Sequence, residues 1–248
     1  RDEWKQAQMK AEIADPDLRV RYFIGDVRDQ DRLTRAMEGV EVIIHGAALK
    51  RIETAHYNPV ELCKTNIIGT VNVIQAVDDQ RVKKAILLST DKAYQPISAY
   101  GVSKAMAENL FVSANNTRRD DGPLFSVTRY GNIAGSTGSV IPIWKKMIAE
   151  GHEIMPVSDP DVTRFWMWDF EAITLVGRLI ERMRGGEIEV PTLSAYRLGD
   201  LAEAMGVKMD IRGLGEYEKL HESMRDGLSS YYAQRLTVEE LREMLKDV

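Results

Sequence analysis

The sequence predicts an α/β protein built on a doubly wound parallel sheet, because short apolar runs alternate with stretches of helical periodicity along its first half. Runs typical of strands lie at residues 19–24, 41–45, 85–88 and 125–129. The stretches between them predict helices at residues 30–38, 59–79 and 98–119. Strands that alternate with helices pair in parallel through right-handed crossovers, so we expect a layered fold.

The pattern loosens after Tyr130, where we expect a smaller, mixed α/β lobe. The spacing of apolar residues predicts helices at 140–150, 169–184, 197–205 and 237–246, with one strand at 187–190. We therefore divide the chain into residues 1–130, which carry the parallel sheet, and residues 131–248, which form mainly the lobe and return in part to the core.

Composition narrows the class of protein. The 248 residues, 44% of them hydrophobic, suffice to bury a sizeable core. The net charge of -5, with basic residues scattered among acidic ones, argues against nucleic-acid binding. No apolar run approaches about 18 residues, so we expect a cytoplasmic protein without a membrane span. The single Cys63 excludes an internal disulfide, and we expect it to be buried on a helix.

A polar block follows the strand at 85–88, at the end of the sheet where open α/β folds bind ligands. Tyr100 and Lys104 lie four residues apart in the helix predicted at 98–119, so their side chains share one face. An ammonium group beside a phenol favours the phenolate, which makes Tyr100 a candidate base. This spacing also recurs by chance on exposed helix faces.

Asp91 and Lys92 strengthen the hypothesis of an active site. Adjacent at the end of a strand, they offer a proton donor and a proton acceptor in one place. The alternative is an exposed turn, which the helix that follows makes less attractive. Thr90, just before them, is a candidate contact for an oxygen of the substrate or a cap for the backbone.

Several motifs together resemble one enzyme family. Its order of landmarks is matched by Ser89-Thr90-Asp91-Lys92-Ala93, Tyr100-Gly101-Val102-Ser103-Lys104, Arg129-Tyr130-Gly131-Asn132, Thr163-Arg164-Phe165-Trp166 and Glu218-Lys219-Leu220-His221-Glu222. The chain thereby resembles the soluble, inverting UDP-N-acetylglucosamine 4,6-dehydratases of the extended short-chain dehydrogenase/reductase group. The resemblance implies a Rossmann-like dinucleotide-binding domain over residues 1–130 and a substrate-binding lobe over residues 131–248.

The resemblance also implies a mechanism. Tyr100, assisted by Lys104, would take the proton of the C4 hydroxyl while NADP, or alternatively NAD, accepts hydride. Lys92 would then remove the C5 proton and Asp91 would protonate the departing C6 hydroxyl, with Thr90 near the C4 oxygen. Lys92 must be neutral for this step, so we expect its pKa to be depressed. The product, inverted at C5, would enter surface-sugar biosynthesis of the pseudaminic-acid type.

Further site residues follow from the resemblance alone. The implied cofactor contacts are Arg1, Asp26, Val27, Ala47, Ala48, Lys50, Asn66, Ser89, Tyr100 and Lys104. The implied substrate contacts are Lys50, Thr90, Asn132, Arg164 and Arg212. One departure stands out: the family has Arg-Pro-Gly where this chain has Gly215-Glu216-Tyr217, so Arg212 is named only as a substitute for the missing arginine.

Two parts of the family's pattern are absent from the sequence. Such folds begin with a strand and a glycine-rich turn that binds the pyrophosphate, and nothing before residue 19 fits that pattern. The run from Gly131 to Gly138 imitates the turn, but it lies downstream of the candidate catalytic helix. The stretch 224–229 is also short for the family. We expect backbone breaks before Arg1 and within 224–229, or alternatively a truncated protein.

Three functions stay open on the sequence. The first is the inverting dehydratase acting on a nucleotide sugar, and the second is a nucleotide-sugar 4-epimerase, which would need Tyr100 and Lys104 but not Asp91 and Lys92. The third is a non-catalytic binding or assembly protein. The apolar side chains of Val102 and Met106 could pack inside the fold or against a partner helix, and relatives associate in this region, so we expect a homo-oligomer.

Overall fold

The computed structural model describes residues 2–248, and its largest sheet has four parallel strands in the order β1-β2-β3-β7. These strands are β1 (Val42–His45), β2 (Lys84–Thr90), β3 (Leu124–Tyr130) and β7 (Ile188–Glu189). The parallel sheet and its covering helices confirm the predicted Rossmann-like α/β fold class.

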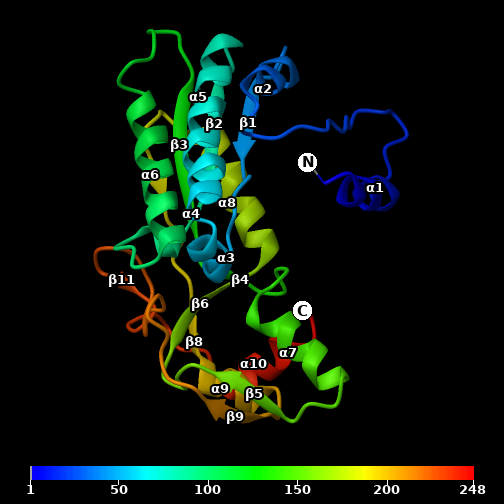
Figure 1. The fold of residues 1–248 in the computed structure, drawn as a ribbon, viewed down its shortest axis with the longest axis vertical. Helices are drawn as coiled ribbons and strands as arrows, with labels where there is room; N and C mark the ends of the chain where they lie inside the picture. The colour runs from blue at the N-terminus through cyan, green and yellow to red at the C-terminus, as the bar shows by residue number, and fades with distance from the viewer. Residues whose placement is uncertain (1) are drawn as a thin grey trace.

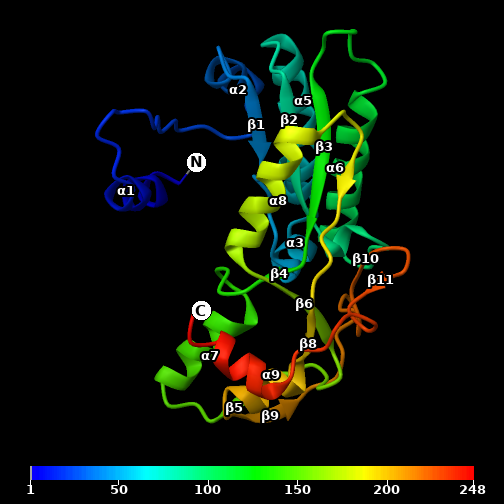
Figure 2. The same ribbon diagram turned by 180° about the vertical axis from the view of Figure 1, so that it is seen from behind.

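Two apolar cores cover the two faces of this sheet, because side chains along a strand point alternately to opposite sides. Ala85 and Leu87 of β2 pack with α5 (Gly69–Asp79) and α6 (Ala99–Ala114) in one core. Ile86 of β2 packs with α8 (Asp169–Arg182) in another. Figures 1 and 2 show α5 and α6 on one side of the sheet and α8 on the other.

The helical stretch predicted at 59–79 is confirmed, although it changes pitch along its length. It comprises α4 (Pro59–Leu62), a π-helical segment (Cys63–Ile68) and α5. Cys63 lies on this helix but is exposed, so the prediction that it is buried was wrong. The helix expected at 98–119 ends at Ala114, because the side chain of Asn115 turns to bind the backbone of Phe125 in β3.

The lobe below the sheet is built from short strands and helices. One small sheet joins β4 (Asn132–Ile133), β6 (Thr163–Met167) and β8 (Ala195–Arg197), and another joins β5 (Ile154–Val157) and β9 (Lys208–Ile211). Their core includes Trp144 of α7 (Val140–Ala149), Leu201 of α9 (Leu198–Ala204) and Leu241 of α10 (Val238–Met244). Helix α8 and strand β7 return from this half of the chain to the large sheet (Figure 2).

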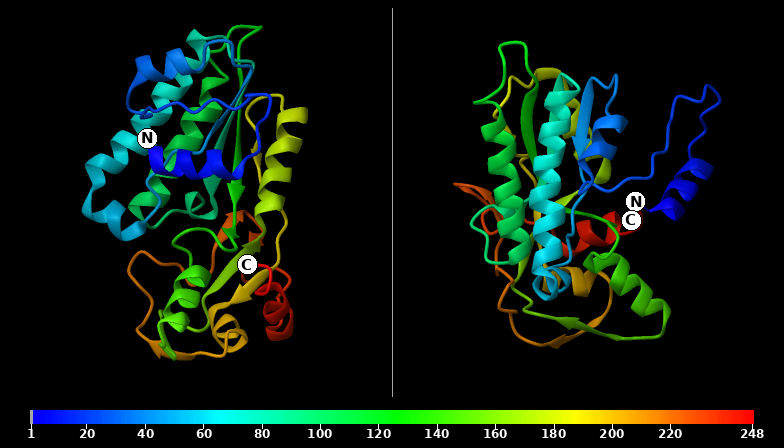
Figure 3. Two further views of the ribbon diagram at one scale, coloured as in Figure 1. Left: turned by 90° about the vertical axis from the view of Figure 1, so that its right-hand side faces the viewer. Right: turned by 45° about the horizontal axis from the view of Figure 1, so that its top comes forward.

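The first predicted strand, at residues 19–24, was wrong. This segment contains no β-strand, and Val20, Phe23 and Ile24 are at least 39% exposed. A strand needs a neighbour with which to exchange backbone hydrogen bonds, and none of the described strands pairs with this segment. Helix α1 (Glu3–Glu12), which precedes the segment and buries none of its residues, lies away from the sheet (Figures 1 and 3).

The backbone break expected within 224–229 is also absent. Strands β10 (Ser223–Arg225) and β11 (Leu228–Ser229) form an antiparallel hairpin through this stretch. Gly227 has a φ of +73°, a conformation that glycine adopts without strain and that permits the tight turn. Arg1, where the other break was expected, lies outside the described residues. Across residues 2–248, no helix combines the length and the apolar character that a membrane span requires.

Candidate active site

Strand β2 delivers the polar block to the carboxyl edge of the sheet. After Thr90 the chain forms one 3₁₀ turn (Asp91–Ala93), in which the backbone N–H of Lys92 donates to the hydroxyl of Thr90. Helix α6 then packs directly against this turn at Gly101. A Cβ atom at Gly101 would lie only 2.4 Å from the carbonyl oxygen of Lys92, so this close approach requires glycine.

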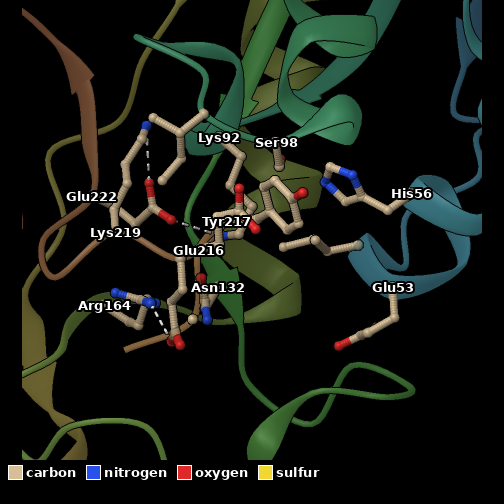
Figure 4. A pocket seen from close by; sticks show the side chains of 14 residues that line it. Glu53, His56, Lys92, Ser98, Asn132, Arg164, Glu216, Tyr217, Lys219 and Glu222 are labelled. Carbon is tan, nitrogen blue, oxygen red and sulfur yellow. Dashed lines mark hydrogen bonds and ion pairs between the residues drawn. The ribbon is translucent and has the colours of Figure 1, made fainter. Parts of the chain in front are cut away.

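Lys92 lies between two buried carboxylates. Its ammonium nitrogen is 3.1 Å from Oδ1 of Asp91. It is also 3.3 Å from Oε1 of Glu222 (Figure 4). Asp91 is 1% exposed and Glu222 2%, while Oδ2 of Asp91 has no hydrogen-bond partner among the described residues. Asp91 and Glu222 come from opposite halves of the chain, so this three-residue site forms only when the lobe packs against the sheet.

The expected depression of the Lys92 pKa was wrong. Burial lowers the pKa of this ammonium, and the positive charge of Arg164 lowers it further, but the carboxylates of Asp91 and Glu222 outweigh both, so the pKa is raised. Lys92 is therefore protonated in the site as it stands. The sequence indicated the contact with Asp91 but not the second carboxylate.

The environment of Tyr100 differs from the one expected. Burial raises the pKa of its phenol, whereas the nearby charge of Lys92 and a hydrogen bond with Thr90 lower it less strongly. The cation that favours the phenolate in this structure is thus Lys92 and not Lys104. Tyr100 and Lys104 nevertheless project from the same face of α6, as their spacing predicts, toward the end of β2.

Lys104 is buried without a carboxylate at hydrogen-bonding distance among the described residues. Its ammonium nitrogen donates to the carbonyl oxygen of Leu88, at 2.7 Å. Burial lowers the pKa of Lys104 to about 8, although the charge of Glu108 acts in the opposite direction. A substantial fraction of this lysine is consequently neutral near physiological pH, in contrast to Lys92.

A cavity of about 520 Å³ opens beside Lys92. Figure 4 shows its wall, in which the ring of Tyr217 stacks on that of His56 from α3 (Ile52–Tyr57), with centroids 3.6 Å apart. Asn132 and Arg164 also line the cavity. Its dimensions are in the range of small-molecule sites, and it mixes apolar walls with converging charged groups.

The sequence-predicted substrate contacts do not all reach this cavity. Arg164 lines it, but its guanidinium also binds Oε1 of Glu218, at 2.8 Å, and backbone carbonyls of the lobe. Arg212 lies outside the cavity lining, is exposed, and pairs with Asp210. In the sequence, Gly215 stands where the family has its arginine, and Gly215 lines the cavity. The structure therefore does not bring Arg212 to that position.

The residues expected along a nicotinamide cofactor gather at the carboxyl ends of β1 and β2. The hydroxyl of Ser89 is buried without a hydrogen-bond partner among the described residues. The ammonium of Lys104 binds the carbonyl oxygen of the preceding residue, Leu88. Ala47 and Ala48 follow β1, where Ala47 is exposed and Ala48 half-buried. Lys50 donates to the backbone of Thr137, at 3.1 Å, in the glycine-rich run. An unpartnered hydroxyl beside a buried lysine fits a ligand rich in hydroxyl groups, such as the ribose of this cofactor.

Asn66 has a structural role in this edge. Its amide side chain accepts from the backbone N–H of Leu49, donates to the Leu49 carbonyl, and donates to the hydroxyl of Ser103, all within 3.0 Å. It thereby fixes the loop after β1 against α6. This arrangement fixes the loop that carries the predicted cofactor contacts Ala47 and Ala48. Direct contact between Asn66 and the cofactor stays a prediction.

The remaining cofactor predictions lie farther along the same edge. Asp26 pairs with the guanidinium of Arg28, at 3.0 Å, and Val27 packs against Gly69 of α5. A Cβ atom at Gly69 would come within 2.7 Å of the Val27 side chain, so glycine permits this contact. Arg1, the expected contact for a 2′-phosphate, lies outside the described residues.

Several residues of the site were missed as functional candidates, among them Glu222 and Tyr217. Glu222 was noted only as part of a motif, and Tyr217 only as a departure from the family's pattern. A buried glutamate cannot be recognised from sequence by its spacing, because its partner Lys92 lies in a distant segment. The family motif that contains Glu222 was the one available signal.

Comparison with known proteins shows the family to which the chain is related. Residues 1–238 match the model of the family described as "Polysaccharide biosynthesis protein". The chain is 46% identical over 226 residues to a UDP-N-acetylglucosamine 4,6-dehydratase (inverting) of Campylobacter jejuni, covering 90% of this chain and 67% of the relative. It is 38% identical over 246 residues to a UDP-glucose 4-epimerase of Rickettsia akari, covering 94% and 71%.

Solved structures share the fold. The X-ray structure of Pen from Bacillus thuringiensis superposes with a TM-score of 0.93 at 32% identity, covering all of this chain and 88% of the other. DesIV of Streptomyces venezuelae, a dTDP-glucose 4,6-dehydratase solved with NAD bound, gives a TM-score of 0.80 at 22% identity, covering 97% and 82%. The second likeness shows the fold alone.

Proposed function

Because the chain belongs to the polysaccharide biosynthesis protein family, we propose that it is a nucleotide-sugar 4,6-dehydratase, acting on UDP-N-acetylglucosamine with inversion at C5. One observation carries this proposal beyond family membership. Lys92 lines the cavity and pairs with the buried Asp91, and both lie at the strand end that Tyr100 and Lys104 face. Removing water from a sugar requires both pairs.

The first pair suits oxidation at C4. When bound, a nicotinamide cofactor would accept hydride from C4 and later return it to C6. Tyr100 would take the proton of the C4 hydroxyl, and the nearby charge of Lys92 and the Thr90 hydrogen bond assist by favouring the phenolate. Lys104, held at the Leu88 carbonyl, and the unpartnered hydroxyl of Ser89 would hold the ribose.

The second pair suits elimination. A ketone at C4 acidifies the hydrogen at C5, which Lys92 in its neutral form would remove. The electrons of the C5–H bond form the C5–C6 double bond as the C6–O bond breaks. Asp91 would donate a proton to the departing oxygen, so water leaves. The unpartnered Oδ2 of Asp91 is the free atom that such a proton needs. We propose that reprotonation at C5 comes from the face opposite Lys92, which inverts that carbon.

A second candidate is a nucleotide-sugar 4-epimerase, which the 38% identity to an epimerase of Rickettsia akari favours. An epimerase would oxidise and reduce C4 with Tyr100 and Lys104 and leave C5 and C6 untouched. The two functions therefore differ in what happens to the C5 hydrogen.

Incubation with UDP-N-acetylglucosamine in D₂O, followed by NMR, tests the proposal. The dehydratase predicts loss of one water, a methyl group at C6, deuterium at C5 and coupling constants of the inverted sugar. An epimerised product that retains the C6 hydroxyl and the C5 hydrogen would replace the proposal with the second candidate. Unchanged substrate, with the cofactor shown to be bound, would overturn both.

The cofactor, the assembly and the biological role are also proposals. We propose NADP, and titration calorimetry with NADP⁺ and NAD⁺ compares the two affinities. We propose a homo-oligomer through α6, because Val102 and Met106 are 53% and 46% exposed there, and light scattering in solution measures its mass. We propose that the product serves surface-sugar synthesis of the pseudaminic-acid type in the cytoplasm, and fractionation of cells locates the protein.

A further inference from the structure

Glu222 is buried in this site and contacts two lysines, but the proposed mechanism gives it no role. Its carboxylate lies between two lysines, with Oε1 3.3 Å from Nζ of Lys92 and Oε2 3.4 Å from Nζ of Lys219 (Figure 4). The two distances are nearly equal. The same carboxylate therefore divides its charge between the candidate base and a second lysine, whose nitrogen also donates to the carbonyl of Tyr94 at 2.7 Å.

The backbone of Glu222 is fixed by the lobe. Its N–H donates to the hydroxyl of Ser230, at 2.9 Å, and its carbonyl accepts from the Ser230 N–H, at 2.8 Å. The Ser230 hydroxyl also lies 2.7 Å from that of Thr163 at the start of β6, and all three residues are buried. The position of the carboxylate is thus set by packing in the lobe, not by a flexible surface loop.

Asp91, Lys92 and Glu222 hold the same number of protons in two arrangements. In one, the proton is on Lys92, and both carboxylates are charged. In the other, the proton has moved from Lys92 to Asp91, which lies 3.1 Å away. Only the second arrangement has a neutral Lys92 as base and a protonated Asp91 as acid, which is the state that elimination requires.

We propose that Glu222 is a positioning residue that controls which of Lys92 and Asp91 holds this proton, and that Lys219 modulates the control by drawing on the same carboxylate. This inference rests on the proposed dehydration. When the Glu222 carboxylate pairs mainly with Lys92, it stabilises the ammonium and keeps the proton on that lysine. When the carboxylate pairs mainly with Lys219, it stabilises the Lys92 ammonium less, so the proton can move to Asp91. The site then holds a neutral base and a protonated acid.

The other charged and titratable groups around Lys92 do not replace this control. Arg164 of β6 repels the ammonium, and Tyr100 of α6 and Tyr196 of β8 sense its charge without being ionised near neutral pH, because burial raises both of their pKa values. Among the described residues, the carboxylates that pair with Lys92 are those of Asp91 and Glu222. Asp91 takes part in the proton transfer itself, which leaves Glu222 as the control.

Two substitutions should act in opposite directions. Glu222→Gln removes one of the two negative charges that hold the proton on Lys92, so the neutral fraction of the lysine should rise about tenfold for each unit by which its pKa falls. Lys219→Met leaves Glu222 with Lys92 alone, so the neutral fraction should fall. A residue that merely supported the fold would not produce shifts of opposite sign.

Competitive labelling with acetic anhydride measures the neutral fraction without requiring turnover. Lys92 is acetylated only when neutral, and its modification is counted by mass spectrometry relative to the exposed Lys10 in the same protein. We expect about tenfold more labelling of Lys92 in Glu222→Gln and less in Lys219→Met. Glu243→Gln, which removes a surface carboxylate paired with Lys246, should leave Lys92 unchanged.

The pH profile of dehydration supplies the second measurement. Because the reactive arrangement holds as many protons as the resting one, the substitutions should change the height of the pH-independent plateau of the rate, which should rise in Glu222→Gln and fall in Lys219→Met. Unchanged Lys92 labelling in both folded variants would overturn the inference. If Glu222→Gln does not fold, Lys219→Met alone decides it. Labelling that shifts as expected, in a protein that forms no dehydrated product, would overturn the proposed function and leave the control by Glu222 standing.

Discussion

Lys92 and Lys104 lie twelve positions apart in the sequence, and the structure treats them in opposite ways. Lys104 has a backbone carbonyl as its hydrogen-bond acceptor, and burial lowers its pKa to about 8. Lys92 has two carboxylates, and its pKa is raised despite burial. Burial alone therefore does not determine whether a lysine of this site is neutral. The neighbouring charges decide whether its pKa is raised or lowered.

In the proposed mechanism, the two lysines serve different steps. Lys104 and Tyr100 both belong to α6, and the partner of Lys104 belongs to the adjacent strand β2, so this half of the site is built within the large sheet and its helices. Lys92 depends on Glu222, which reaches it from the lobe. Under that proposal, oxidation at C4 would depend on residues of the sheet and its helices, whereas elimination would require the two halves of the chain to be correctly packed.

Substitution of Lys92 by alanine should produce the largest effect. Loss of a general base reduces rates by about 10²- to 10⁴-fold, so dehydration should fall by that factor. Oxidation at C4 should persist, visible as reduction of the nicotinamide cofactor when substrate is added. Lys104→Ala should instead slow that reduction. Dehydration at the normal rate in Lys92→Ala would remove the base assignment.

Stability should separate the same two lysines. Lys92→Met leaves the buried carboxylates of Asp91 and Glu222 without Lys92, and breaking such a pair costs about 3 kcal/mol, the lower end of the usual range because Lys219 still pairs with Glu222. Urea unfolding at pH 7 measures this loss. A variant as stable as the native protein would show that the carboxylates are not held by the lysine.

The pH dependence of unfolding should differ in sign between them. Lys104 has a pKa of about 8 in the folded protein and about 10.4 when unfolded, so the unfolded chain binds more protons between these values. Relative to Lys104→Met, the native protein should therefore gain roughly 2–3 kcal/mol as pH rises from about 7 to about 10.5. Relative to Lys92→Met it should gain nothing over that range, and its advantage should fall at higher pH, because the folded pKa of Lys92 lies above the unfolded one.

A smaller effect tests the packing that brings α6 to Lys92. Gly101→Ala places a Cβ atom 2.4 Å from the Lys92 carbonyl, so the helix must shift and the protein should lose about 1–3 kcal/mol. Gly177→Ala in α8 is the matched control, because nothing lies within 4 Å of its added atom, and it should gain about 0.5–1 kcal/mol. Equal stabilities in denaturant titrations would contradict the close approach at Gly101.

The sequence predicted what depends on local pattern. The strands predicted at 41–45 and 85–88 and the start of the helix predicted at 98–119 follow from apolar runs and helical periodicity, although β2 extends to Thr90. The acid–base block could likewise be placed at a strand end. The strand expected at 19–24 was wrong because apolar composition alone does not supply a pairing partner.

The pKa of Lys92 could not be predicted for a related reason. Its sign depends on Glu222, and that contact exists only after β6 and the β10–β11 hairpin have placed the glutamate beside β2. The stacking of Tyr217 on His56 is equally non-local. A residue that acts through its contact with another residue, as we propose for Glu222, carries no recognisable sequence pattern and is identified only from the three-dimensional structure.

The contrast between the two lysines can be measured directly by NMR titration of their side-chain Cε signals, assigned with Lys92→Arg and Lys104→Arg. We expect Lys104 to titrate near pH 8 and Lys92 to stay charged throughout the range in which the protein remains folded. Titration of Lys92 at a lower pH than Lys104, or of both lysines near the ordinary value of about 10.4, would contradict the account.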